Sequence, residues 1–207
     1  MSAPAAPLRT SPQPTPIRDW FVRNRVRLSV VLFTGIVVAA IALGVQPHNV
    51  RDFSDPVVLA GLLLVIGGVL IRTWAAGTLR KREVLVQDGP YRFIRHPLYL
   101  GSFLLTTGFF VLCGLTLSLI LIVIPIFFAY VFAIRHEERF LAEKFGQEWA
   151  AYSARVPGLI PWKLPSSVNL AWTYRQWARN REYQAMLASI AGLAGLYAWR
   201  VFISGAI

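Results

Sequence analysis

The stretch Gly89–Gly101, GPYRFIRHPLYLG, begins in a polar connector, residues 78–96, and ends in an apolar helix. A glycine–proline turn signal begins it, and Pro97 opens an apolar run that reaches Cys113. Proline suits the first turn of a helix, because its missing N–H would have no partner within the helix there. We therefore expect Arg95 and His96 to lie at the N-terminus of a membrane helix, an end that attracts carboxylates and other anions.

The rest of the chain is strongly apolar, since 56% of its 207 residues are hydrophobic, against roughly 45–50% in soluble domains. The apolar residues gather in long runs, which predict an all-α integral membrane protein with about five transmembrane helices. The expected spans are residues 28–45, 57–76, 98–113, 115–134 and 186–203. Residues 1–16 are rich in Pro, Ala, Ser and Thr and predict a disordered tail. Residues 17–207 are expected to form a single membrane domain, which ends in an interfacial helix and last span over residues 166–207.

The basic residues predict the topology. With five spans and a cytoplasmic N-terminus, every Lys and Arg except Arg51 and Arg200 falls on one side of the membrane. The positive-inside rule places that side in the cytoplasm. The net charge of +11 is then explained by topology and by anionic lipid, so no nucleic-acid partner is expected. Arg72, in the last turns of the second expected span, can extend to the membrane interface.

The third and fourth expected spans form a hairpin with a tight turn at Gly114. The start of one span must therefore lie near the end of the other, which brings His96 and Tyr99 close to Glu137 and Glu138. We expect a cytosolic-face cofactor pocket there, open beside the lipid. Simpler interpretations of the same residues stay open: a helix cap, aromatic residues of the membrane interface, and solvated surface charges.

Two separated motifs resemble those of the isoprenylcysteine carboxyl methyltransferase family, which is related to membrane phospholipid N-methyltransferases. The first motif is RHPxYxG, from Arg95 to Gly101, and the second is the pair Glu137-Glu138. A third pattern, FGxxWxxYxxRVPxxIP, begins at Phe145. The resemblance covers roughly residues 57–162. The combination is specific, whereas RHP alone would be a weak signal.

This resemblance implies methyl transfer from S-adenosylmethionine to a lipid-like or small hydrophobic acceptor. In this resemblance, residues 83–86 contact the cofactor through their backbone atoms. The residues that the resemblance assigns to the cofactor are Glu83, Val84, Leu85, Val86, Tyr91, His96, Pro97, Leu98, Tyr99 and Glu137.

The chemistry of these side chains agrees with that assignment. Glu137 can pair with the ammonium group of the cofactor, and Arg95, His96 or the helix N-terminus can bind its carboxylate. Tyr91 or Tyr99 can offer an aromatic face or a hydroxyl near the sulfonium. No metal is required, and the sequence has no His, Cys and carboxylate cluster with metal-ligand spacing.

The candidate catalytic residues are Arg95, His96 and Glu138. A carboxylate acceptor needs no general base, whereas an amine acceptor must lose a proton, for which Glu138 or His96 are possible groups. In the prenylcysteine enzymes we expect a basic residue about four positions before the first glutamate, but that position here is Ala133. Arg135 is the nearest candidate for contacting the substrate. The acceptor therefore stays open among a lipid amine, a thiol and an isoprenoid-linked carboxylate.

Two other functions are compatible with parts of this pattern. One is an NADPH-dependent membrane reductase of the sterol-reductase type, and the other is a non-catalytic membrane module. The glutamate pair together with RHPxYxG favours the methyltransferase.

Overall fold

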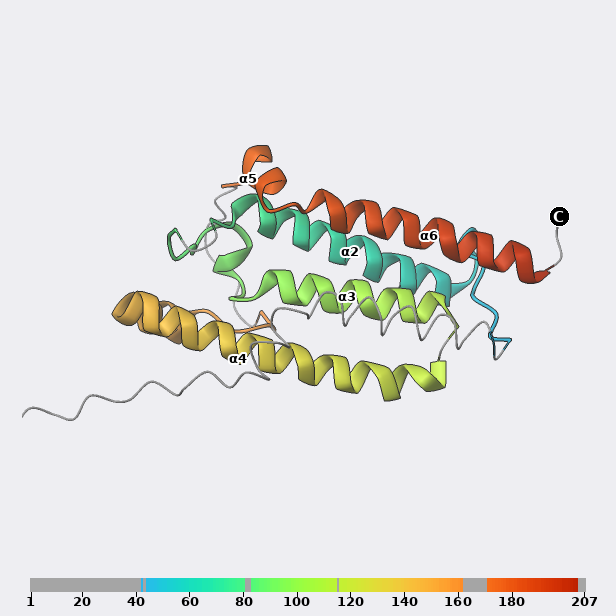
Figure 1. Cartoon of the computed structure of the whole chain (residues 1–207), viewed down its shortest axis with the longest axis horizontal. Helices are drawn as coiled ribbons and strands as arrows, with labels where there is room; N and C mark the ends of the chain where they lie inside the picture. The colour runs from blue at the N-terminus through green and yellow to red at the C-terminus, as the bar shows by residue number, and fades with distance from the viewer. Residues whose placement is uncertain (1–41, 43, 81–82, 115, 162–170, 205–207) are drawn as a thin grey trace, which may run out of the picture. The chain divides into compact units, whose positions relative to one another are not determined.

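The structure is a computed structural model that describes residues 42, 44–80, 83–114, 116–161 and 171–204 (Figure 1). The chain divides into two units, Met1–Leu43 and Gly44–Ile207, and the helices named below all belong to the second. Its long helices are α2 (Pro56–Thr78), α3 (Pro97–Leu112), α4 (Thr116–Arg155) and α6 (Tyr183–Ser204). Two short helices, η1 (Gly89–Arg92) and α5 (Tyr174–Arg179), complete it. The expected tail and nearly all of the first expected span lie outside the described residues.

All regular elements in the described ranges are helices, as the sequence predicts. Two of them, Pro56–Thr78 and Tyr183–Phe202, are long and apolar enough to cross a membrane, and α3 is a shorter apolar helix. The helices α2, α3 and α6 begin and end within a few residues of the predicted spans. The number of spans stays a prediction.

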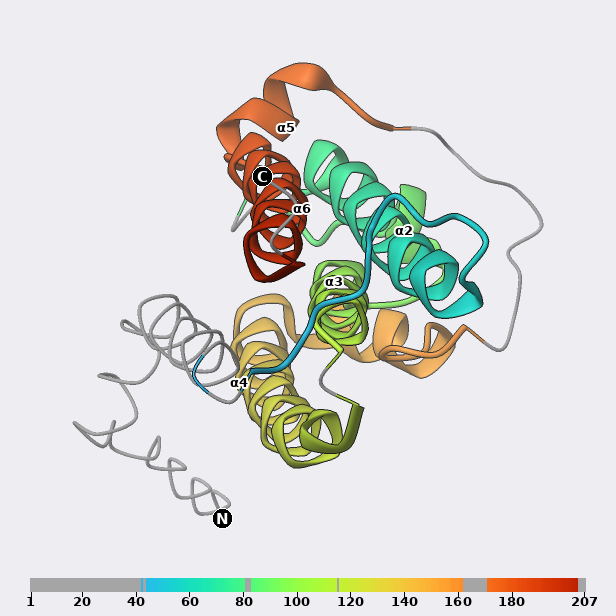
Figure 2. The same ribbon diagram turned by 90° about the vertical axis from the view of Figure 1, so that its right-hand side faces the viewer.

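A seam of glycines brings α2 and α3 together in antiparallel packing, side by side in Figures 1 and 2. Gly61 of α2 faces Gly108 of α3, and Gly68 faces Gly101. A Cβ at Gly68 would lie 2.7 Å from the carbonyl oxygen of Gly101, and one at Gly108 would lie 2.7 Å from that of Gly61. Such close approach of two backbones is available only to glycine at these positions.

The hairpin between α3 and α4 turns at Gly114, as predicted. This residue has φ of 71°, and a Cβ there would lie 2.7 Å from the carbonyl oxygen of Gln46. The following α4 is longer than the predicted fourth span, because helical structure continues through the charged segment to Arg155, with a kink at Gly146. Its one non-helical residue is Gly146, with φ of 49°. The helix ends at Arg155, just before Pro157.

The C-terminal segment caps the end of α2. The last carbonyl groups of a helix have no partner within it, and here side chains and backbone from residues 172–180 donate to them. The donors and acceptors are Trp172 Nε1 to Thr73 O (2.9 Å), Thr173 N to Gly77 O (3.0 Å), Gln176 Nε2 to Leu79 O (2.6 Å) and Asn180 Nδ2 to Ala76 O (2.7 Å). From α5 the chain enters α6, which lies beside α2 (Figure 1).

Candidate functional site

The RHP motif meets the second glutamate of the pair across the hairpin. Nε2 of His96 lies 3.0 Å from Oε1 of Glu138, and Nη2 of Arg95 lies 3.0 Å from the same oxygen. His96 is only 3% exposed and makes no side-chain cap to α3. The hydrogen bond from His96, and then the charge of Arg95, lower the pKa of Glu138 despite its partial burial. The predicted proximity of His96 to Glu138 is therefore confirmed.

An aromatic row continues from this contact along α3 to α4. The ring of Tyr99 packs edge-on against His96, with centroids 5.8 Å apart, and against Tyr130 of α4, with centroids 5.9 Å apart. Edge-to-face pairs of this kind contribute about 0.5–1.5 kcal/mol each beyond their buried area. The row fixes the rings beside the His96–Glu138 contact.

The segment after α4 holds the motif connector in place. The backbone N–H of Arg95 donates to the carbonyl of Pro157 (2.8 Å), and that of His96 donates to Gly158 (3.1 Å). The hydroxyl of Tyr152 donates to the carbonyl of Tyr91 (2.7 Å). The third sequence pattern, which contains Tyr152 and Pro157, thus holds the RHPxYxG motif and the residues before it in place through hydrogen bonds.

The hydroxyl of Tyr91 is buried and has no hydrogen-bond partner within the described ranges. Burial raises the pKa of Tyr91, and the negative charge of Glu137 raises it further. Glu137 is half-buried, and no ion pair involves it in the part of the chain that the structure describes. A buried polar group without a partner calls for an explanation, and a bound ligand supplies one. The hydroxyl of Tyr91 and the carboxylate of Glu137 together suit a ligand with a cationic, hydrogen-bonding group.

Other predicted site residues are not brought to this contact. Arg135 is exposed and makes no hydrogen bond or ion pair with any described residue. Glu83 is exposed and pairs with Arg179 at 2.9 Å. Pro97 is fully buried, and Leu98 is half-buried. In the described ranges no group of His, Cys, Asp and Glu side chains is placed to hold a metal ion.

Several residues near the site were not among the predicted ones. Trp149 lies under the guanidinium of Arg95, 5.5 Å from ring centroid to Cζ, and the matched tail pattern already contained this residue. Arg72 pairs with Glu182 and donates to Ser102. No local sequence pattern indicates that pairing.

Comparisons with known proteins agree with the motif assignment. The sequence model of the phospholipid methyltransferase family matches residues 56–148. The cobalt-zinc-cadmium resistance protein CzcN of Cupriavidus metallidurans is 33% identical over 148 residues, which cover 69% of this chain and 66% of that protein. The protein-S-isoprenylcysteine O-methyltransferase of Saccharomyces cerevisiae is 36% identical over 113 residues, or 49% of this chain and 47% of that enzyme. The methanethiol S-methyltransferase 1 of Bradyrhizobium diazoefficiens is 34% identical over 80 residues, which cover 35% of this chain and 25% of that enzyme.

No solved structure matches the chain. The chain spans about two thirds of the length of the first of these relatives and less than half of the other two. The region that matches the family contains both RHPxYxG and the glutamate pair, whose side chains meet at the His96–Glu138 contact. Residues 56–148 therefore carry the sequence pattern of the phospholipid methyltransferase family, and the chain is similar to the isoprenylcysteine O-methyltransferases.

Proposed function

We propose that this protein is an integral-membrane, S-adenosylmethionine-dependent methyltransferase that acts on a lipid-like or small hydrophobic acceptor. The observation that carries the proposal is the 3.0 Å contact between His96 and Glu138, which joins the two halves of the signature. Similarity to these methyltransferases supports methyl transfer and does not favour the reductase. The non-catalytic module remains the alternative that the experiment below must exclude.

The donor is proposed to bind between the connector and α4. Glu137 pairs with its ammonium group, and Tyr91 and Tyr99 lie near its sulfonium. Arg95, His96 and the N-terminus of α3 bind its carboxylate. The residues that complete the proposed donor site are Pro97, Leu98 and the backbone of Glu83, Val84, Leu85 and Val86.

When bound, S-adenosylmethionine supplies a methyl group that is already activated, so the protein has to align the acceptor and exclude water. An amine acceptor must also lose a proton, and Glu138 or His96 is proposed to take it. Arg95 holds the carboxylate of Glu138 toward His96. Arg135 is proposed to contact the polar group of the acceptor, because it is exposed one helical turn before Glu138.

The proposed topology has several spans, with the N-terminus and the site on the cytoplasmic side. The distribution of Lys and Arg supports it. Residues 17–207 are proposed to act as one membrane domain, with the bilayer as the route of the acceptor and the cytosol as the route of the donor.

Calorimetry on the purified full chain in lipid nanodiscs tests the proposal. We expect binding of S-adenosylmethionine and none of NADPH. Binding of NADPH alone would support the reductase, and binding of neither ligand would support the non-catalytic module. Either result contradicts the proposal.

A second experiment identifies the acceptor. The protein is incubated with radiolabelled methyl donor and a host lipid extract, and the labelled fraction is isolated. Label released by mild base indicates a methyl ester and hence a carboxylate acceptor. Base-stable label in a lipid indicates an amine, and volatile label indicates a small thiol. No transfer to any fraction contradicts the proposed activity.

A further inference from the structure

Arg72 joins three helices through one guanidinium group. Its Nε and Nη2 donate to the two carboxylate oxygens of Glu182 at 2.6 and 2.9 Å, and its Nη1 donates to the hydroxyl of Ser102. Arg72 belongs to α2, Ser102 to α3, and Glu182 directly precedes α6. Glu182 is only 6% exposed, so the ion pair is largely shielded from solvent. Its carboxylate comes from the C-terminal segment, beyond the region that matches the family.

Arg72 packs against the end of the RHPxYxG motif. A Cβ at Gly101, the last residue of the RHPxYxG motif, would lie 2.5 Å from Cγ of Arg72. The end of the same helix also packs on the connector, where a Cβ at Gly89 would lie 3.0 Å from Oγ1 of Thr78. Tyr91 follows Gly89 closely, and the charges of both Arg72 and Glu182 act on its pKa. Arg72, Glu182 and Tyr91 therefore share one poorly solvated region.

A lone arginine in that region would oppose the binding of a cation. S-adenosylmethionine carries a sulfonium charge that its product, S-adenosylhomocysteine, lacks. Charges in a region of low dielectric constant interact strongly, because water does not screen them. The carboxylate of Glu182, which accepts from both Nε and Nη2, compensates the charge of Arg72.

We infer that Glu182 is a positioning residue that neutralises Arg72, so that the site beside Tyr91 can accept the cationic methyl donor. The C-terminal segment, residues 171–204, then supplies an electrostatic component of the donor site as well as a cap for α2. This inference rests on the proposed function and assigns to that site a residue outside the family signature.

A purely structural ion pair makes a different prediction. Breaking a buried pair by removing one partner destabilises a protein and would weaken the binding of every ligand alike. An electrostatic role depends on the charge of the ligand. The ratio of the dissociation constants of S-adenosylmethionine and S-adenosylhomocysteine separates the two roles, because the ligands differ by the methyl group and its positive charge.

The experiment measures both dissociation constants by calorimetry on the full chain in nanodiscs, together with thermal unfolding. In Glu182→Gln an uncompensated positive charge remains, and we expect the ratio to rise roughly tenfold. The double variant Arg72→Gln/Glu182→Gln removes both charges, and its ratio should return to the wild-type value. Arg72→Gln alone removes the cation, so its ratio should stay at or below that of the wild type.

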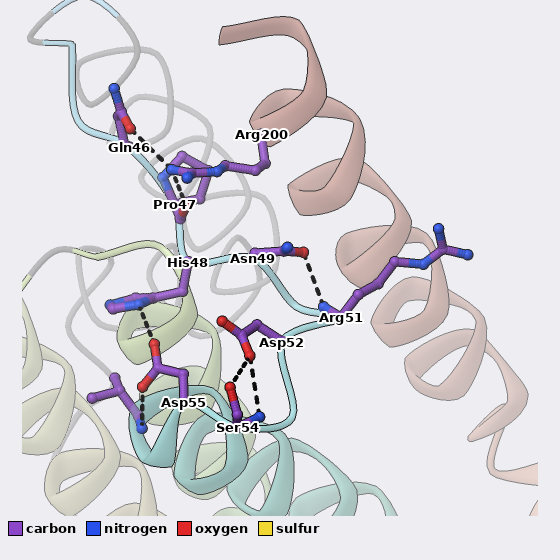
Figure 3. A network of polar contacts seen from close by, with 10 residues as sticks. Gln46, Pro47, His48, Asn49, Arg51, Asp52, Ser54, Asp55 and Arg200 are labelled. Atoms are coloured by element: carbon purple, nitrogen blue, oxygen red, sulfur yellow. Dashed lines mark hydrogen bonds and ion pairs between the residues drawn. The ribbon is translucent and has the colours of Figure 1, made fainter. Parts of the chain in front are cut away.

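Arg200→Gln is the matched control. It removes an arginine from the other end of α6, where Nη1 of Arg200 donates to Oε1 of Gln46 at 2.9 Å and to the carbonyl of Pro47 at 3.4 Å (Figure 3). That end of α6 lies away from the connector, so the ratio should equal the wild-type ratio.

A wild-type ratio in folded Glu182→Gln overturns the inference. A raised ratio in Arg72→Gln also overturns it, and this result is available even if Glu182→Gln does not fold. A wild-type protein that binds neither ligand contradicts the proposed function instead. The two failures are therefore distinguishable.

Discussion

The adjacent glutamates of α4 have different surroundings, and replacing each by glutamine should separate their roles. Oε1 of Glu138 lies 3.0 Å from both Arg95 and His96, so Glu138→Gln removes the charge on which both contacts depend. Glu137 makes no ion pair with any described residue, and Glu137→Gln keeps its size. We expect the first change to reduce stability and the second to reduce donor binding.

The magnitude follows from the contacts. A hydrogen bond to a charged group contributes about 1.5–3 kcal/mol, and the side chain of Glu138 is 28% exposed, so solvent weakens each of its two contacts. We expect a loss of about 2 kcal/mol in the free energy of unfolding, or about 4–8 °C in Tm for a chain of this size. For Glu137→Gln, one lost charge-assisted contact corresponds to a donor affinity about ten- to a hundredfold lower.

Thermal unfolding and calorimetry with S-adenosylmethionine, on the same preparations, measure the two effects. Glu143→Gln is the matched control, because Glu143 is an exposed glutamate of the same helix. It should change neither quantity. The reasoning is refuted if Glu137→Gln lowers Tm as much as Glu138→Gln does, or if folded Glu137→Gln binds the donor with wild-type affinity.

Three further predictions follow from the geometry. Gly101→Ala would place a Cβ 2.5 Å from Cγ of Arg72, so unfolding measurements should show a loss of about 1–3 kcal/mol. Tyr152→Phe leaves the carbonyl of Tyr91 without its donor, and chemical denaturation should show a loss of about 1–3 kcal/mol. The pKa of Glu138 is lowered in the folded protein, so its stabilising contribution is complete above the ordinary value of 4.5 and is lost as pH falls through the folded pKa. The difference in Tm between wild type and Glu138→Gln should therefore shrink in acid.

The sequence predicted the hairpin and the approach of its two ends, for identifiable physical reasons. Pro97 can begin a helix but not continue one, and Gly114 can adopt the left-handed conformation of the turn. Two helices joined by so short a turn must run back along each other. The approach of His96 to the pair Glu137-Glu138 follows from that connection alone.

The sequence could not show which glutamate pairs with the RHP motif. Glu137 and Glu138 differ by about 100° around α4, and only the rotation of the helix decides which one faces Arg95. Nor could it show the pairing of Arg72 with Glu182, because the two residues are 110 positions apart and belong to segments with no common pattern. Contacts of this kind depend on tertiary packing rather than on local propensity.

The glycine seam between α2 and α3 also has a mechanical consequence. Sliding either helix along the other would drive a side chain into the backbone that Gly68 and Gly101 now admit, so shear between these two helices is blocked. We expect α2 and α3 to keep their relative position when ligands enter and leave. Opening of the site then requires movement of α4 relative to the connector. These two segments are joined at Arg95 and Glu138 by a polar contact that can break and re-form.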